Sequence, residues 1–113
     1  MQVHRTAMMV LGVAMLGIAV GIPAAGAGDA AAGKDLYMKK CKTCHGADGQ
    51  GNPGVAKLLN VTFKPLGSEE IQKKNDAEFK KIITEGKDKM KPVKDLSDAD
   101  MDNIIAFVRT LKQ

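Results

Sequence analysis

The residues best suited to chemistry lie in one short stretch, CKTCH at positions 41–45. It holds both cysteines of the 113-residue chain and one of its two histidines. Two thiols three positions apart could form a disulfide, act as a redox dithiol, supply half of a zinc site or attach a haem covalently. The rest of the sequence discriminates among these four chemistries.

Three of the four chemistries fit the surrounding sequence poorly. A thioredoxin-like dithiol opens a helix after a strand, whereas here a predicted helix precedes the motif and a glycine-rich stretch follows it. A tetrahedral zinc site needs four ligands, and beyond the N-terminal segment the chain offers only Cys41, Cys44 and His45. A disulfide that closes so short a loop stabilises little and leaves His45 without a role.

The pattern Cys-x-x-Cys-His is instead typical of covalent haem attachment. The two thiols add to the two vinyl groups of the porphyrin and form thioethers, so they have to lie about one helical turn apart. The histidine that follows then lies beneath the iron and can bind it. The sequence therefore predicts haem c bound through Cys41 and Cys44, with His45 as an axial ligand of the iron.

A second axial ligand has to come from another part of the chain. Met38 lies in the predicted helix before the motif, too near to reach the opposite face of the haem, and Met101 fits the apolar stripe of the last predicted helix. Met90 lies in the lysine-rich stretch KDKMKP, where it has no core to join. We therefore expect Met90 to be the sixth ligand, with a lysine or an open position as alternatives; a thioether ligand raises the reduction potential.

The N-terminal segment has the features of a secretory signal peptide. A positive start precedes an uncharged apolar run over residues 6–22, and residues 25–27 offer small side chains to a signal peptidase. We expect cleavage after Ala27, which leaves residues 28–113 as a single periplasmic domain with no stable membrane insertion. An uncleaved membrane anchor is the alternative, because the apolar run is near the lower limit for a bilayer span.

Basic residues outnumber acidic ones, and the formal net charge of the chain is +4. Lysines gather near both predicted ligand segments, and we expect them to dock acidic redox protein partners at a lysine-rich haem edge. Nucleic-acid binding is not expected, because the net charge is small and aromatic residues do not alternate with the basic ones. The lysines are Lys39, Lys40 and Lys42 beside the cysteines, and Lys87, Lys89, Lys91 and Lys94 around Met90.

Local start and stop signals predict an all-α domain with long loops and no strand. Asp29 can cap a first helix, while Asn75 with Glu78 and Ser97 with Asp100 have the spacing of capping boxes. The predicted helices cover residues 29–40, 68–74, 75–85 and 97 onward, and the glycine-rich residues 46–65 are predicted to be a loop. The last helix carries an apolar stripe made of Met101, Ile104, Ile105, Val108 and Leu111.

With these motifs the chain resembles the small bacterial class I cytochromes c over nearly all of residues 29–112. In that family a G-x-x-x-aromatic motif in the first helix packs against an aromatic residue in the last helix. The matching residues here are Gly33 and Tyr37, then Ile104, Phe107 and Val108. The resemblance implies an all-α class I cytochrome c fold around one covalently attached haem c, and an exported one-electron carrier rather than an enzyme.

Two features depart from that family. The Gly-Pro-x-Leu motif, whose proline carbonyl accepts the Nδ1 proton of the ligand histidine, is replaced by AKLL at residues 56–59, so we expect an acceptor among residues 53–57. A tryptophan that holds a haem propionate in some relatives is absent, and Thr62 and Lys64 are the candidate replacements. A dedicated electron-transfer subunit of a larger exported oxidoreductase stays open, as does a five-coordinate haem sensor or peroxidase.

Overall fold

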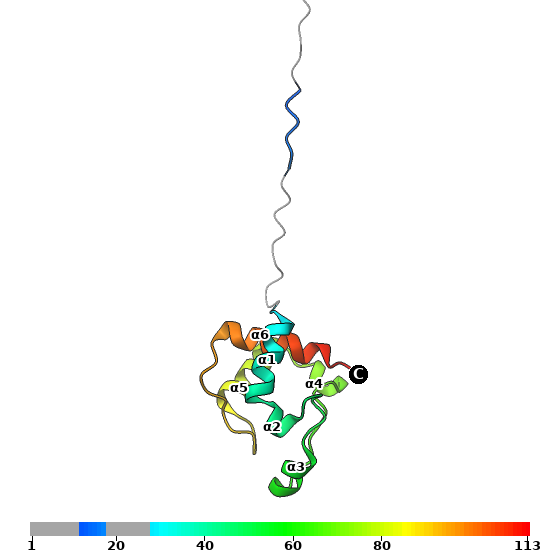
Figure 1. The fold of residues 1–113 in the computed structure, drawn as a ribbon, viewed down its shortest axis with the longest axis vertical. Helices are drawn as coiled ribbons and strands as arrows, with labels where there is room; N and C mark the ends of the chain where they lie inside the picture. The colour runs from blue at the N-terminus through cyan, green and yellow to red at the C-terminus, as the bar shows by residue number, and fades with distance from the viewer. Residues whose placement is uncertain (1–11, 18–27) are drawn as a thin grey trace, which may run out of the picture.

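The computed structural model describes residues 12–17 and 28–113. Residues 12–17 are exposed and have no regular secondary structure, and the rest of the predicted signal peptide lies outside the described residues. Within the described ranges, no helix has the length and apolar character that a membrane crossing requires. The helices there, shown in Figure 1, are α1 (Ala30–Lys40), α2 (Lys42–His45), α3 (Pro53–Leu59), α4 (Glu69–Gln72), α5 (Asp76–Glu85) and α6 (Asp98–Thr110).

Helices α1 and α6 cross at very close range (Figure 1). At the crossing, a Cβ atom added to Gly33 would lie 1.7 Å from the carbonyl oxygen of Asn103, so only a glycine fits there. One turn later the Tyr37 side chain is 1% exposed, and its ring centroid lies 5.0 Å from that of Phe107. The expected contact between the G-x-x-x-aromatic motif and the last helix is therefore confirmed.

The core is built from α1, α5 and α6. The predicted stripe of α6 is largely correct, because Ile104, Ile105 and Val108 are buried, while Met101 and Leu111 are half-buried. Among the described residues all buried side chains of the core are apolar or aromatic: Tyr37, Phe79, Ile83, Ile104, Ile105, Phe107 and Val108.

The predicted capping interactions form at three helix starts. The Asp29 side chain accepts hydrogen bonds from backbone amides in the first turn of α1. Asn75 with Glu78 and Ser97 with Asp100 form reciprocal capping boxes at the starts of α5 and α6. Each such cap contributes about 1 kcal/mol to stability, so local sequence fixes where these helices begin.

The prediction of one long loop over residues 46–65 is wrong for α3. The Asn52 side chain accepts hydrogen bonds from the first-turn amides of α3, Pro53 occupies the first turn, and Asn60 ends the helix in the left-handed conformation with φ 54°. These residues are favourable at those positions, and they outweigh the glycines of the segment. Figure 1 shows α3 at one end of the domain, away from the α1–α6 crossing.

Replacing Gly33 by alanine tests the close crossing of α1 and α6, because two physical effects predict changes of opposite sign in the free energy of unfolding. Helix propensity alone predicts that Gly33→Ala stabilises the protein by about 1 kcal/mol, whereas overpacking against Asn103 predicts a loss of about 1–3 kcal/mol. We expect the loss, measured by denaturant unfolding of the purified protein. Gly54→Ala in α3 is the matched control, because its Cβ would meet only Asn52 Oδ1 at 3.3 Å. A stabilised Gly33→Ala variant would contradict the close crossing.

Candidate haem-binding site

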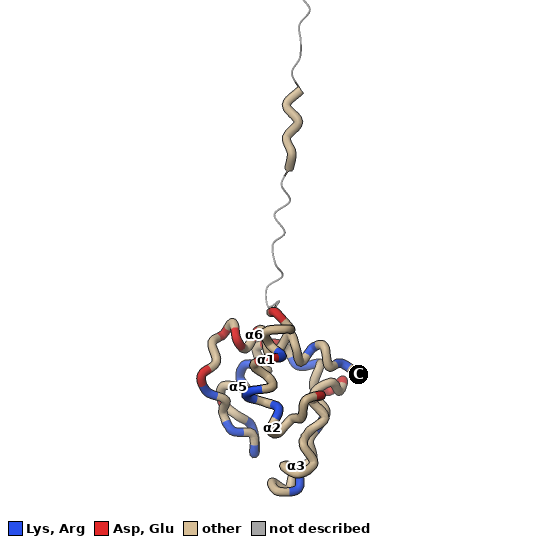
Figure 2. Tube along the Cα trace, viewed as in Figure 1, with Lys and Arg blue, Asp and Glu red and all other residues tan. Residues whose placement is uncertain are grey.

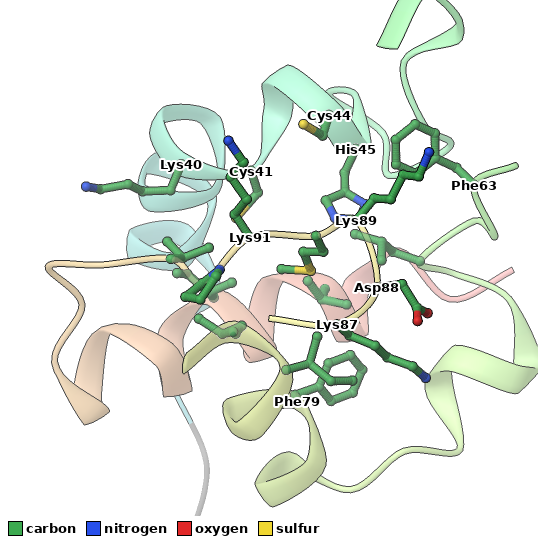
Figure 3. Close-up of a pocket in the computed structure, with 18 of the residues that line it drawn as sticks. Lys40, Cys41, Cys44, His45, Phe63, Phe79, Lys87, Asp88, Lys89 and Lys91 are labelled. Carbon is green, nitrogen blue, oxygen red and sulfur yellow. The ribbon is translucent and has the colours of Figure 1, made fainter. Parts of the chain in front are cut away.

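The four residues predicted to hold the haem line a single cavity of about 920 Å³. Cys41 and Cys44 with His45 come from the end of α1 and from α2, and Met90 comes from the loop between α5 and α6. Figure 3 shows Cys41, Cys44 and His45 along one side of this cavity. Its volume lies within the range of roughly 300–1,000 Å³ that is usual for cofactor sites.

Helix α2 and the turn after it fix the position of the CxxCH motif. The His45 amide donates to the Cys41 carbonyl at 3.0 Å, and the Gly51 amide donates to the His45 carbonyl at 2.7 Å. The buried Tyr37 hydroxyl donates to the Gly46 carbonyl at 2.6 Å. Burial raises the pKa of Tyr37 to about 12, so the hydroxyl stays protonated and keeps donating this hydrogen bond.

The motif side chains are free to react and to bind. Both cysteines are free thiols: Cys41 is half-buried, which raises its pKa to about 11, and Cys44 is exposed. Burial lowers the pKa of His45, which favours the neutral imidazole that binds metals. His45 Nδ1 is buried without a hydrogen-bond partner among the described residues, so Nε2 is the nitrogen that can face the cavity. The backbone acceptor expected among residues 53–57 is therefore not formed.

An aromatic contact that the sequence did not reveal orients the His45 ring. Phe63 packs edge-on against it, with the ring centroids 5.6 Å apart (Figure 3). Phe63 lies well beyond the motif in an irregular segment, and no local pattern relates the two residues. An imidazole held in one orientation suits a metal ligand, because its rotation is limited before it binds.

A tight turn presents Met90 to the cavity. Lys87 and Met90 exchange backbone hydrogen bonds of 3.0 and 2.8 Å, and they form an isolated bridge. Gly86 precedes the turn with φ 77° and ψ 173°, a conformation that is essentially restricted to glycine. The Val93 amide donates to the Ile83 carbonyl at 2.8 Å, which ties the other end of the loop to α5.

The other two candidate methionines lie away from the cavity. Met38 packs against the hydrophobic core, and Met101 Sδ accepts a hydrogen bond of 3.7 Å from the Thr84 hydroxyl. Neither residue lines the cavity, whereas Met90 does. Of these three methionines, Met90 is therefore the one placed to reach a group in the cavity.

Apolar walls and a basic rim complete the cavity. The walls include Leu59, Val61, Phe79, Ile82, Ile104 and Val108. Of the lysines expected near the haem, Lys39 and Lys42 do not line the cavity, whereas Lys40, Lys64, Lys87, Lys89, Lys91 and Lys94 do. Lys74, which was not expected there, lines it as well. Figure 2 shows basic segments near α2, α3 and the Met90 loop, while acidic segments lie at the starts of α1 and α6.

These residues fit haem c. An apolar cavity of cofactor size suits a flat macrocycle, two thiols one turn apart suit two thioethers, and the imidazole and the thioether that line the cavity suit the iron.

Comparisons with known proteins agree with this fit. Residues 28–108 match the family model described as cytochrome c oxidase, cbb3-type, subunit III. The chain belongs to this family of c-type cytochromes. A curated relative, "Cytochrome c-554(547)" of Halothiobacillus neapolitanus, is 40% identical over 91 residues, which cover 76% of this chain and 100% of the relative. The solved structure of the c-type cytochrome KustC0563 matches with 31% identity and a TM-score of 0.61, over 72% of this chain and 98% of that chain.

Family membership confirms part of what the sequence predicts. The all-α cytochrome c fold is confirmed by the helical structure and by its similarity to a solved c-type cytochrome. As a c-type cytochrome, the protein binds haem c covalently and carries electrons.

Opposite substitutions in the Met90 turn test how strictly its backbone is fixed. Gly86→Ala should destabilise this cytochrome by about 1–3 kcal/mol, because alanine disfavours the Gly86 backbone conformation and its Cβ would lie 2.5 Å from the Met90 carbonyl oxygen. Asp88→Gly is the matched control: Asp88 has φ 52°, which glycine adopts freely, so its effect should stay within about 1 kcal/mol. Thermal unfolding of the haem-loaded protein measures both, and equal stability of Gly86→Ala and wild type would refute a rigid turn.

Proposed function

We propose that this cytochrome is an exported monohaem one-electron carrier, in which Cys41 and Cys44 form the thioethers and His45 and Met90 bind the iron. The main support is that all four residues line one cavity although Met90 lies far from the motif in the sequence. When bound, haem c supplies a one-electron Fe(III)/Fe(II) couple, which takes an electron from a donor protein and gives it to an acceptor.

The chain's own residues suit a reaction in which little moves. Phe63 packs against the His45 ring, and backbone hydrogen bonds fix the main chain of His45 in α2 and of Met90 in its bridge with Lys87. The apolar walls of the cavity would leave little room for water beside the ligand side chains once haem is bound. Fixed ligands and a dry cavity keep the rearrangement that accompanies electron transfer small, and this is the protein's share of the function.

The family description names an oxidase subunit, which makes a dedicated subunit of a larger oxidoreductase the second candidate. Permanent complexes have large apolar interfaces. Within residues 28–113, which the structure describes throughout, Leu58 of α3 is the one large apolar side chain that is exposed, at 82%. This surface favours a carrier that binds its partners transiently.

We also propose that residues 1–27 are removed as a signal peptide and that the domain is periplasmic. The support is the apolar N-terminal run, followed by small residues before Gly28, together with the exported setting in which c-type haem attachment usually occurs.

Acidic redox partners would dock at the lysines around the cavity. Lys40 from α1 and Lys91 and Lys94 from the Met90 loop are exposed and line the cavity. Positive charge at the opening speeds the encounter with acidic surfaces at low salt.

Spectra of the oxidised protein test the axial ligands. Wild type should show a weak near-infrared sulfur-to-iron band. Met90→Ala should lose this band and have a lower midpoint potential. Met101→Leu is the matched control and should keep the band. The intact mass of the wild-type sample is measured first and should equal residues 28–113 plus one haem. A high-spin wild-type spectrum that Met90→Ala leaves unchanged would refute Met90 ligation and favour a five-coordinate sensor or peroxidase.

Charge reversal tests the docking surface. Because the partner is unidentified, the probes are the ferricyanide anion and a cationic cobalt(III) tris-phenanthroline complex, each oxidising the reduced protein. At low salt, Lys40→Glu should slow oxidation by ferricyanide a few-fold and speed oxidation by the cobalt complex. Both oxidation rates should also change less with salt concentration than in wild type. Lys34→Glu, exposed on the same helix but outside the cavity lining, is the control. Equal effects of the two variants would contradict docking at the cavity.

A further inference from the structure

The lysines around the cavity are not equivalent, because three of them lie near one carboxylate, that of Glu70, and lower its pKa. Lys64 Nζ lies 2.6 Å from Glu70 Oε1. This contact lowers the pKa of Glu70, and the charges of Lys74 and Lys87 lower it further. Lys64, Lys74 and Lys87 come from three separate segments, and all three line the cavity. They therefore form a basic cluster on one part of its rim.

This basic cluster lies at the end of the cavity away from the cysteines. Figure 3 shows Lys87 and Phe79 on the opposite side from Cys41 and Cys44. In haem, the two carboxylates lie on the edge of the macrocycle opposite the two vinyl groups. A haem attached through both cysteines therefore directs its carboxylates towards the basic cluster.

The position of Lys74 is set by contacts of its backbone. Arg109 Nη2 donates to the Lys74 carbonyl at 2.7 Å and to Asp76 Oδ1 at 2.9 Å. The Arg109 guanidinium also lies 4.7 Å from the centre of the Phe79 ring, which lines the cavity. Arg109 thus couples the segment that carries Lys74 to the cavity wall.

The cluster also has unpaired charge. Lys74 is half-buried, and neither it nor Lys87 has an ion-pair partner in the part of the chain that the structure describes. Glu70 is paired with Lys64 and Asp76 is paired with Arg109. Asp88 is also at this end, so the two unpaired ammonium groups of Lys74 and Lys87 outnumber it. A partly desolvated ammonium is more stable beside a carboxylate, and this end therefore favours a ligand with negative charge.

We propose that Lys64, Lys74 and Lys87 form the binding site for the two carboxylates of the haem, which leaves the lysines nearer the cysteines, such as Lys40, to dock partners. The proposal rests on the proposed function, because it requires haem in this cavity. It extends the expectation of Lys64 from the sequence to a cluster of three residues.

Electrostatics gives this assignment a measurable consequence. Negative charge near the iron favours the ferric state, and each ammonium beside a haem carboxylate offsets part of that charge. Removing one cluster lysine should therefore lower the midpoint potential, whereas Glu70→Gln, which removes a competing carboxylate from Lys64, should raise it.

The experiment is a spectroelectrochemical titration of the purified holoprotein with no partner present. Lys74→Gln and Lys87→Gln should each lower the reduced-to-oxidised ratio at fixed potential about threefold, which is about 30 mV at 59 mV per tenfold change for one electron. The controls are Lys40→Gln, at the cysteine end of the cavity, and Lys81→Gln, exposed on α5 outside the cavity lining. Both should shift the ratio clearly less.

The possible outcomes separate this proposal from the one it rests on. If the wild-type mass shows no covalent haem, the proposed function fails. If haem is attached but the cluster variants shift the potential no more than the controls, or change only the rate with ferricyanide, the cluster belongs to the docking surface and the proposal is overturned. Lys74→Arg keeps the positive charge and should therefore have the wild-type potential. Lys87 lies on an exposed turn, so Lys87→Gln still tests the proposal if Lys74→Gln fails to fold.

Discussion

The close crossing of α1 and α6 is the contact on which the haem site depends. At Gly33 the two backbones meet with no room for a side chain, and this fixes Tyr37 one turn later. The Tyr37 hydroxyl then holds the turn after the CxxCH motif through the Gly46 carbonyl. On the other side of the crossing, Ile104 and Val108 of α6 form part of the cavity wall. One helix–helix contact therefore positions both the attachment residues and the surface against which the cofactor lies.

The same side chains serve as core and as cofactor site. Phe79, Ile83, Ile104 and Val108 are buried in the protein and also line the cavity. A domain of this size buries too little apolar surface to be very stable on its own, and a macrocycle in the cavity adds the missing apolar contacts. Haem attachment and folding are therefore coupled, since a ligand bound only by the folded state stabilises that state.

Features that depend on neighbouring residues could be predicted from the sequence, whereas contacts between distant residues could not, except where the family resemblance supplied them, as for Tyr37 and Phe107. The capping boxes at Asn75 and Ser97 involve residues three apart, and they form as predicted. Helix α3 forms where a loop is predicted, because its start and stop residues, Asn52, Pro53 and Asn60, outweigh the glycines around them. The contact of Phe63 with His45 depends on how an irregular segment folds back, as does the hydrogen bond of 2.5 Å from Lys89 Nζ to the Leu59 carbonyl. No pattern of spacing encodes such pairs.

The two proposed axial ligands are held by different means. His45 belongs to a helix, lies between hydrogen-bonded turns and packs against Phe63. Met90 depends on one turn, which is tied to α5 through Val93 and to the end of α3 through Lys89. Three residues of that loop, Gly86, Asp88 and Asp95, have positive φ, and two of them are not glycines, so the loop holds a conformation that an unconstrained chain would seldom adopt. The proposed Met90 ligand therefore depends on a loop with an unfavourable backbone conformation, whereas the proposed His45 ligand depends on a helix and an aromatic contact.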